Sequence, residues 1–192
     1  MPPNKSYTDI ESVEAYTLLD IAEEYEANVE SWIIAMSNYV YNVTNRDWLA
    51  DDEESEKFYN GNGKSFLTIP DYIEITDVSV GDNFGENLES KTFYTEQNTP
   101  ITKVYLKDDI FPVGVQNIAI EGILGFAEEV PEDIKWATTV LVAGIVFSQQ
   151  KQNGEITSEK IGNYSVSYDT DKQKADYQRA MDILNSRRLI VL

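Results

Sequence analysis

The stretch that decides the fold runs from Glu121 to Gln152 and reads EGILGFAEEVPEDIKWATTVLVAGIVFSQQKQ. Pro131 is expected to open a helix, because proline is favoured at the first helical position, where its missing N–H costs no hydrogen bond. Glu132 and Asp133 follow in the first turn, where carboxylates interact favourably with the helix dipole. A strand is expected to end just before this helix, with a short glycine-bounded loop between them.

Beyond its first turn this helix is apolar on nearly every side. Its apolar positions are Trp136, Ala137, Val140, Leu141, Val142, Ala143, Ile145, Val146 and Phe147. A helix that is apolar all round has to be buried all round. We therefore expect a central helix that is surrounded by other parts of the chain, either the β insertion or further helices, or by neighbouring subunits.

Two helices are expected before the central one. Thr8 and Glu11 fit a capping box, which predicts a short helix that ends at about Leu19. Asp20 offers a second cap of the same kind. After it, apolar residues recur at intervals of three and four, which predicts an amphipathic helix to about Thr44. The stripe is formed by Val29, Trp32, Ile33, Met36, Tyr39, Val40 and Val43.

Residues 57–121 carry strand signals instead. Asn60–Gly63 lies between two apolar runs, and Asn-Gly predicts a tight hairpin there. A longer strand with an irregularity near Thr76 and Asp77 is expected next. Short strand candidates follow at 92–94, 103–106 and 116–120. We expect a β-rich insertion of about five short strands between the helices.

After the central helix, residues 160–168 alternate and predict an extended arm or a small hairpin. Asp171 can cap a last helix that ends at about Arg188. The predicted class is α+β, mainly α, with about four helices around a central apolar helix. The predicted organisation is N-terminal helices in 1–50, a β-rich insertion in 55–121, the central helix, arm and last helix in 122–188, and an apolar tail in 189–192.

The composition excludes several classes of function. The 192 residues include no Cys and no His, which excludes disulfides, thiolate metal sites and Ser-His-Asp or Cys-His catalysis. With 15 Lys or Arg against 34 Asp or Glu, the net charge is −19. Such a chain repels phosphate backbones and anionic membranes. The longest apolar run lies within Trp136–Phe147, and a membrane-spanning helix needs about 20 residues.

No motif in the sequence carries chemistry. Gly63-Lys64-Ser65 ends like a phosphate-binding loop, but Phe58 stands where the first glycine belongs, and a strand pattern follows. Gly122 and Gly125 lack the third glycine of a dinucleotide fingerprint. The acidic run 51–54 lacks the spacing of a calcium loop and is interpreted as solvated. We expect no catalytic site, no metal site and no cofactor.

The last six residues are different from an ordinary polar chain end. They are Arg187, Arg188, Leu189, Ile190, Val191 and Leu192, two cations followed by four apolar residues. Such a segment favours burial. It either binds a partner's groove or sheet edge, or folds back as an edge strand on its own chain. The sequence leaves both alternatives open.

Several pieces of the chain together resemble a known group of proteins. The most specific pieces are the helix start Val130–Ala137 and the segment Ile161–Tyr168. The other pieces are two helices near the start of the chain, the strand patterns of 58–70 and 73–78, and a final helix that ends Arg187-Arg188-Leu189. Over residues 8–192 the chain resembles the head–tail connector proteins (adaptor or head-completion proteins) of long-tailed bacteriophages.

The resemblance implies a structural virion protein of the phage neck that is not an enzyme. Such proteins form a ring, usually twelvefold, that docks on the portal protein, extends the DNA channel and supports the next neck or tail-completion protein. DNA passes through without specific binding. The protein would be located at the head–tail interface of the virion, after assembly in the host cytoplasm, with no membrane involved. Residues 187–192 are the hypothetical portal anchor.

Two other functions stay open from the residues alone. The β-rich insertion could make the chain a tail or baseplate module that recognises carbohydrate or protein through exposed aromatic residues. A hydrolase that works with a pair of carboxylates is the third possibility, and it would need a cleft that holds a carboxylate of raised pKa.

Overall fold

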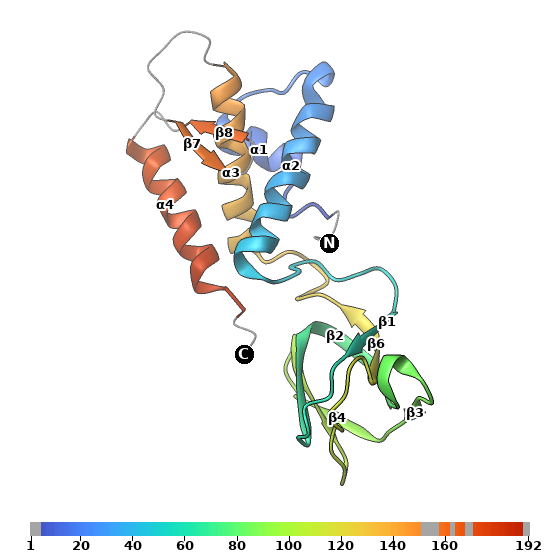
Figure 1. Cartoon of the computed structure of the whole chain (residues 1–192). Coiled ribbons are helices and arrows are strands. Elements are labelled where there is room, and N and C mark those ends of the chain that lie inside the picture. Colours follow the sequence, from blue (N-terminus) through green and yellow to red (C-terminus); the bar gives the residue numbers. More distant parts are fainter. Residues whose placement is uncertain (1–4, 151–157, 162–163, 168–170, 190–192) are drawn as a thin grey trace. The chain divides into compact units, whose positions relative to one another are not determined.

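The computed structural model describes residues 5–150, 158–161, 164–167 and 171–189. The chain divides into two compact units. The first, called the helical unit, contains the described residues up to Asn45 and from Val130 onward. The second, called the β unit, is Arg46–Glu129. Figure 1 shows the labelled helices and the hairpin β7–β8 in one unit and the strands of the large sheet in the other.

The helical unit is built around one central helix. Its elements are α1 (Ile10–Thr17), α2 (Glu23–Thr44), α3 (Glu132–Gln150), the antiparallel hairpin of β7 (Ser158–Ile161) and β8 (Tyr164–Ser167), and α4 (Asp171–Ser186). Helix α3 runs between α2 and α4 (Figure 1). It also contacts α1 and β8. These four neighbours of α3 all belong to the helical unit. The hairpin is one of the two forms predicted for residues 160–168.

The predicted central helix is confirmed as a buried helix. The side chains of Ala137, Val140, Leu141, Val142 and Ala143 have no exposed surface, and Ile145 and Val146 are also buried. Trp136 and Phe147 are half-buried. Helix α3 begins at Glu132, and the carbonyl of Pro131 accepts the N–H groups of Ile134 and Lys135, each at 2.9 Å. Most of the apolar surface of α3 is therefore covered within one chain, by other elements of the helical unit.

The start of α1 differs from the predicted capping box. The N-cap is Asp9, whose carboxylate accepts the N–H of Ser12 at 2.8 Å. The hydroxyl of Thr8 instead lies 2.6 Å from that of Thr139 on α3, and both side chains are buried. The prediction was wrong because the tertiary contact with α3 uses the Thr8 hydroxyl, which leaves the cap to the next residue.

Helix α2 follows the predicted apolar stripe but not the predicted cap. Val29, Ile33, Met36 and Val40 of the stripe are buried. The helix begins at Glu23 after Ala22, and no side chain caps it, so Asp20 does not have the expected role. The apolar positions decide which face of α2 is covered, because burying them contributes more than one cap does.

The β unit contains one six-stranded antiparallel sheet. Its strands are β1 (Ser55–Tyr59), β2 (Phe66–Val80), β3 (Glu89–Ser90), β4 (Phe93–Thr95), β5 (Ile101–Leu106) and β6 (Ile118–Leu124). The order is β1-β6-β2-β5-β4, and β3 pairs with the end of β2. A short 3-10 helix, η1 (Asn83–Gly85), lies between β2 and β3.

Strand β2 organises this sheet because it is long enough to pair on both sides. Its first part pairs with β5 and its second part with β6, and Tyr72 pairs with residues of both. The register shifts between Thr68 and Tyr72, where Pro70 lacks an N–H for the ladder. It shifts again between Ile75 and Asp77, which confirms the predicted irregularity.

The hairpin predicted at Asn60–Gly63 is wrong. Strand β1 pairs with β6 rather than with β2, so the two apolar runs that flank these residues are not hairpin partners. The N–H of Gly61 donates to the side chain of Asn117 at 2.9 Å, and a Cβ at Gly61 would collide with the carbonyl of Pro112. The glycine is needed for a close approach to a distant loop, which the local pattern does not reveal.

The two units together make a mixed α+β protein. The β unit has its own apolar core, formed by Leu67, Ile69, Tyr72, Val78, Ile101, Val104, Leu106, Phe111, Ile118 and Ile120. Because the strands form a complete sheet with this separate core, the structure supports α+β and not the narrower prediction of a mainly α protein.

Candidate interaction surfaces

The predicted partner-binding segment begins at the end of α4. Arg187 donates from Nε and Nη2 to Oδ2 of Asp133, at 3.1 and 2.8 Å. The N–H of Leu189 donates to the carbonyl of Thr44 at 2.7 Å. Arg188 is exposed. The start of the segment is thus held by the first turn of α3 and the last turn of α2, and Ile190–Leu192 lie outside the described residues.

Two charged residues of the helix start Val130–Ala137, Asp133 and Lys135, form ion pairs within the helical unit. Asp133 accepts from Arg187, which directly follows α4, and Nζ of Lys135 lies 2.6 Å from the Oδ2 of Asp9 before α1. Partial burial opposes ionisation of Asp9, but its bonds with Lys135 and Ser12 outweigh this and lower its pKa. The hydrogen bond with Asp9 raises the pKa of Lys135. The two pieces of sequence that resemble connector proteins at α3 and α4 therefore contact each other directly.

A largely buried ion pair joins Arg46, the first residue of the β unit, to Asp71 in the middle of strand β2. Nη1 of Arg46 donates to both carboxylate oxygens of Asp71, each at 2.9 Å, and the Asp71 side chain is only 2% exposed. The guanidinium of Arg46 also lies over the rings of Trp48 and Phe126, which contact each other at a centroid distance of 4.7 Å. Burial raises the pKa of Asp71, although Arg46 partly offsets this rise.

Backbone hydrogen bonds join the first segment of the β unit to its last segment. The N–H of Phe126 donates to the carbonyl of Asp47 at 2.7 Å, and the N–H of Ala50 donates to Ala127 at 2.8 Å. A Cβ at Gly125, whose φ is +133°, would collide with the backbone of Ala50. The first and last segments of the β unit are therefore held side by side. Removing these contacts should lower the stability of the whole β unit and not only that of one loop.

The surface of the β unit carries exposed apolar side chains on two loops. We call residues 81–87 and 107–117 the loop platform. Phe84 is 72% exposed and Val113 is 80% exposed. Ile110 and Val115 are about half exposed. Such a concentration of exposed large apolar residues is typical of an interaction surface, whereas single exposed residues are ordinary.

The loop platform is tied together by backbone hydrogen bonds. The N–H of Phe84 donates to the carbonyl of Val115, and the N–H of Val115 donates to the side chain of Asn83, both at 2.8 Å. Gly85 has a φ of +72°, and a Cβ there would lie 2.6 Å from the ring of Phe58. The platform thus joins the exposed ring of Phe58 on β1 to the apolar residues of the two loops.

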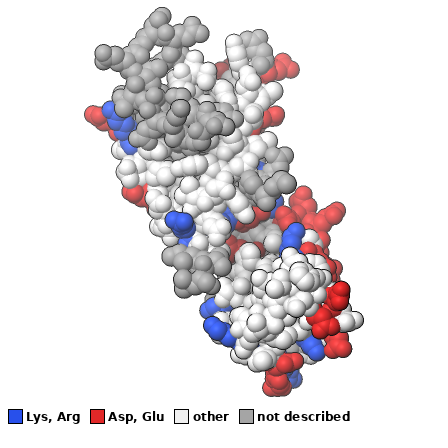
Figure 2. Space-filling view, in the orientation of Figure 1, with Lys and Arg blue, Asp and Glu red and all other residues white. Residues whose placement is uncertain are grey.

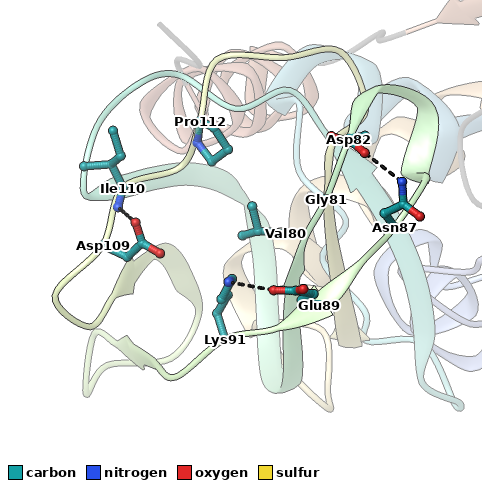
Figure 3. Close-up of a pocket in the computed structure, with 9 residues that line it drawn as sticks. All are labelled: Val80, Gly81, Asp82, Asn87, Glu89, Lys91, Asp109, Ile110 and Pro112. Carbon is teal, nitrogen blue, oxygen red and sulfur yellow. Dashed lines mark hydrogen bonds and ion pairs between the residues drawn. The ribbon is translucent and has the colours of Figure 1, made fainter.

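A hollow of about 380 Å³ opens between the same loops (Figure 3). Three carboxylates line it, those of Asp82, Glu89 and Asp109, together with one cation, Lys91. Lys91 pairs with Glu89 at 3.2 Å. Asp82 accepts from Asn87, and Asp109 accepts the N–H of Ile110, both at 2.8 Å. The hollow is negative, shallow and suited to a basic group.

Figure 2 shows that Asp and Glu side chains gather along one edge of the β unit, beside a largely uncharged area. Among the residues that the structure describes, no group of three or more acidic side chains has the arrangement of a metal site. In that same part of the chain, no helix is both long and apolar enough to cross a membrane.

Three comparisons with known proteins add to this description. No protein-family model and no curated protein matches the chain. Solved structures do match. A chain from the neck of an empty GTA particle, computed with C6 symmetry, is 13% identical with a TM-score of 0.62, over 100% of this chain and 94% of that one. The likeness is one of fold.

Two further structures repeat this result. A chain from the neck of a native GTA particle, computed with C12 symmetry, is 12% identical with a TM-score of 0.56, over 98% of this chain and 96% of that one. A chain from the virion of a native gene transfer agent (GTA) particle is 12% identical with a TM-score of 0.58 and the same coverage. The shared fold includes both units, because the matches extend over nearly the whole chain.

The partner-binding role of residues 187–192 stays a prediction, and the sequence patterns did not single out the loop platform. Residues 107–115 lie between two of the predicted strands, at 103–106 and 116–120. The useful signal was the presence of Val113 and Val115 in a segment rich in turn residues, where polar side chains are the rule. Phe84 gave a similar signal between Asn83 and Gly85. The structure brings these two loops together, and sequence spacing alone could not have done so.

Proposed function

We propose that this chain is a structural protein of the neck of a phage-like particle, and not an enzyme. The observation that carries the proposal is the shared fold of the whole chain with chains from GTA necks, at 94% and 96% coverage of those chains. A match over both units is more specific than a match to one small domain. It agrees with the independent resemblance of the sequence to head–tail connector proteins.

In this role the chain forms a ring that docks on the portal protein and extends the DNA channel. The symmetries of the matching neck structures, C6 and C12, support a ring of twelve copies. The net charge of −19 supports passage of DNA without specific binding, because an acidic surface repels phosphates. Assembly in the host cytoplasm and a final location at the head–tail interface of the virion follow from the same proposal.

The portal anchor in this proposal is the segment Arg187–Leu192. Its start is fastened by the Arg187–Asp133 ion pair and by the bond from Leu189 to Thr44. Those contacts would direct the apolar residues that follow toward a partner from a defined position. Four apolar residues can contribute several kcal/mol when a partner buries them, at roughly 1.5–3 kcal/mol for each large side chain.

The proposal is tested with the purified chain and the purified portal protein of the same particle. Electron microscopy and native mass measurement should show a ring stacked on the portal. Deleting Leu189–Leu192 should abolish this complex, while the circular dichroism spectrum stays that of the folded protein. A wild-type chain that remains a monomer and ignores the portal would contradict the neck function. Normal binding by the deletion variant would contradict only the anchor.

A second candidate function is favoured by the exposed apolar side chains of the β unit. A tail or baseplate module that recognises protein or carbohydrate would also carry such residues, including Tyr94, which is 54% exposed on β4. This candidate differs from the first in assembly, because it requires no ring on the portal. The experiment with purified portal therefore separates the two.

A further inference from the structure

We propose that the loop platform is the docking surface for a second neck protein, the one that follows this chain on the tail side. This inference rests on the proposed neck function. The platform's exposed apolar residues are Phe84, Ile110, Val113 and Val115. Leaving large apolar side chains in water is unfavourable, and burying each one against a partner contributes to binding. The partner must therefore present apolar side chains of its own.

The platform is preorganised for such a contact. The two bonds between Asn83-Phe84 and Val115 fix the loops to each other. Asn117 fixes the second loop internally, because its side-chain amide donates to the carbonyl of Pro112 at 2.9 Å. Preorganised loops lose little conformational entropy on binding, so a moderate apolar area is enough for stable association.

The hollow beside the apolar residues adds a charge requirement. Glu89 and Lys91 neutralise each other at 3.2 Å, which leaves the carboxylates of Asp82 and Asp109 as the net charge of the hollow (Figure 3). Each of these carboxylates uses one oxygen for its bond with Asn87 or with the N–H of Ile110. A Lys or Arg of the partner can take the other oxygens. The occupant is therefore a protein surface with apolar residues beside a basic side chain.

The same charges argue against two other occupants. DNA would bring phosphates to a carboxylate-lined hollow, which is repulsive. A contact between the platforms of two copies would bring the carboxylates of Asp82 and Asp109 in one copy against the same carboxylates in the other. Like-charge contacts across an interface suppress wrong partners. A contact of the platform with the same platform of a second copy is therefore disfavoured.

The neck role explains why the partner is not the portal. A connector binds two different proteins, and two different partners require two different surfaces. The portal is assigned to residues 187–192 of the helical unit in the proposed function. The loop platform belongs to the β unit, so it is made of different elements from the segment assigned to the portal.

The experiment uses the full chain, assembled on purified portal, and the purified next neck protein as the probe. The variant Phe84→Ser with Val113→Ser removes the two most exposed apolar residues of the platform. We expect affinity for the probe to fall at least about 30-fold, as for loss of an interface hot spot. Asp82→Asn with Asp109→Asn should reduce affinity about 3- to 10-fold, and added salt should shrink this difference.

Tyr94→Ser is the matched control, because it removes an exposed aromatic residue of the same unit outside the platform. It should bind the probe as the wild type does. Normal portal binding by the platform variant shows that the variant is folded and that the neck function stands. Unchanged probe affinity in that variant would overturn the inference. Loss of ring assembly or of portal binding instead would also overturn it, because the occupant would then be a copy of this chain or the portal.

Failure of the neck function itself is recognised separately. If the wild-type chain forms no complex with the portal, binding of the probe is measured with the chain free in solution. Loss of that binding in the platform variant alone would support the docking surface without the neck role. Absence of any binding by the wild-type chain would overturn the docking surface.

Discussion

The two units of this protein place apolar and charged groups in opposite ways. In the helical unit the apolar residues of α3 are buried, and the ion pairs Asp9–Lys135 and Arg187–Asp133 lie at the surface. In the β unit the carboxylate of Asp71 is buried, and large apolar residues of the loop platform are exposed. Leu18 and Tyr25 of the helical unit are exposed too, so the β unit differs in two respects: it buries a charge, and its exposed apolar residues lie on loops that hydrogen bonds join.

The difference indicates where function is concentrated. An apolar helix that its own unit largely covers has a structural role, and changing its buried residues should alter stability. Exposed apolar loops contribute little to folding, so changing them should alter binding. The departures in the β unit are thus the more informative features, because folding alone does not require them.

The largest expected effect tests the buried charge. Arg46→Met leaves Asp71 buried without its cation, which should lower the free energy of unfolding by about 3–5 kcal/mol. Burial already raises the pKa of Asp71, and without Arg46 the pKa rises further. The loss should therefore be greatest at neutral pH and shrink in acid, where the carboxyl is protonated in the folded state. Urea denaturation at both pH values measures it.

The double variant Arg46→Met with Asp71→Asn is the control for this prediction. It removes the charge as well as its partner, so it should lose less stability than Arg46→Met alone. Equal losses by Arg46→Met at neutral and acid pH would show that packing on Trp48 and Phe126, rather than the ion pair, is what Arg46 contributes.

A second prediction compares one apolar residue from each unit. Leu141→Ala in α3 removes a side chain with no exposed surface and should lower the free energy of unfolding by about 2–5 kcal/mol. Val113→Ala in the loop platform should change it by no more than about 0.5 kcal/mol. Chemical denaturation of both variants measures the contrast. A comparable loss at Val113 would mean that the platform is part of a folding core.

The smallest expected effect concerns the surface charge of the helical unit. Asp9→Asn keeps the N-cap of α1 but removes the ion pair with Lys135, and should cost less than about 1 kcal/mol. Asp9→Ala removes both and should cost roughly 1 kcal/mol more. Since the folded pKa of Asp9 is lowered, its contribution is complete above the ordinary value of 3.8 and is lost as the pH falls through the folded value. Thermal melts of the wild type and Asp9→Asn should therefore converge in strong acid, and a persistent gap would contradict the role of the charge.

Sequence patterns predicted the positions of helices and strands better than they predicted which distant residues contact each other. The apolar run of α3, the stripe of α2 and the irregularity of β2 all lie where local periodicity placed them. The hairpin at Asn60–Gly63 and the cap at Thr8 were wrong for one shared reason. Gly61 is committed to Asn117, and Thr8 is committed to Thr139. Contacts between residues far apart in the chain override a local preference worth about 1 kcal/mol.

The sequence by itself excluded disulfides, thiolate metal sites and catalysis by Ser-His-Asp or Cys-His groups. It also located the helix at the centre of the helical unit. The absence of His and Cys and the net charge of −19 are properties of composition, and the burial of α3 follows from its apolar residues. Only the tertiary structure decided how α3 is covered, which strands pair, and that Phe84 and Val113 are exposed on joined loops. The physical reason is that periodicity acts within one element, whereas covering, pairing and exposure depend on which distant segments meet.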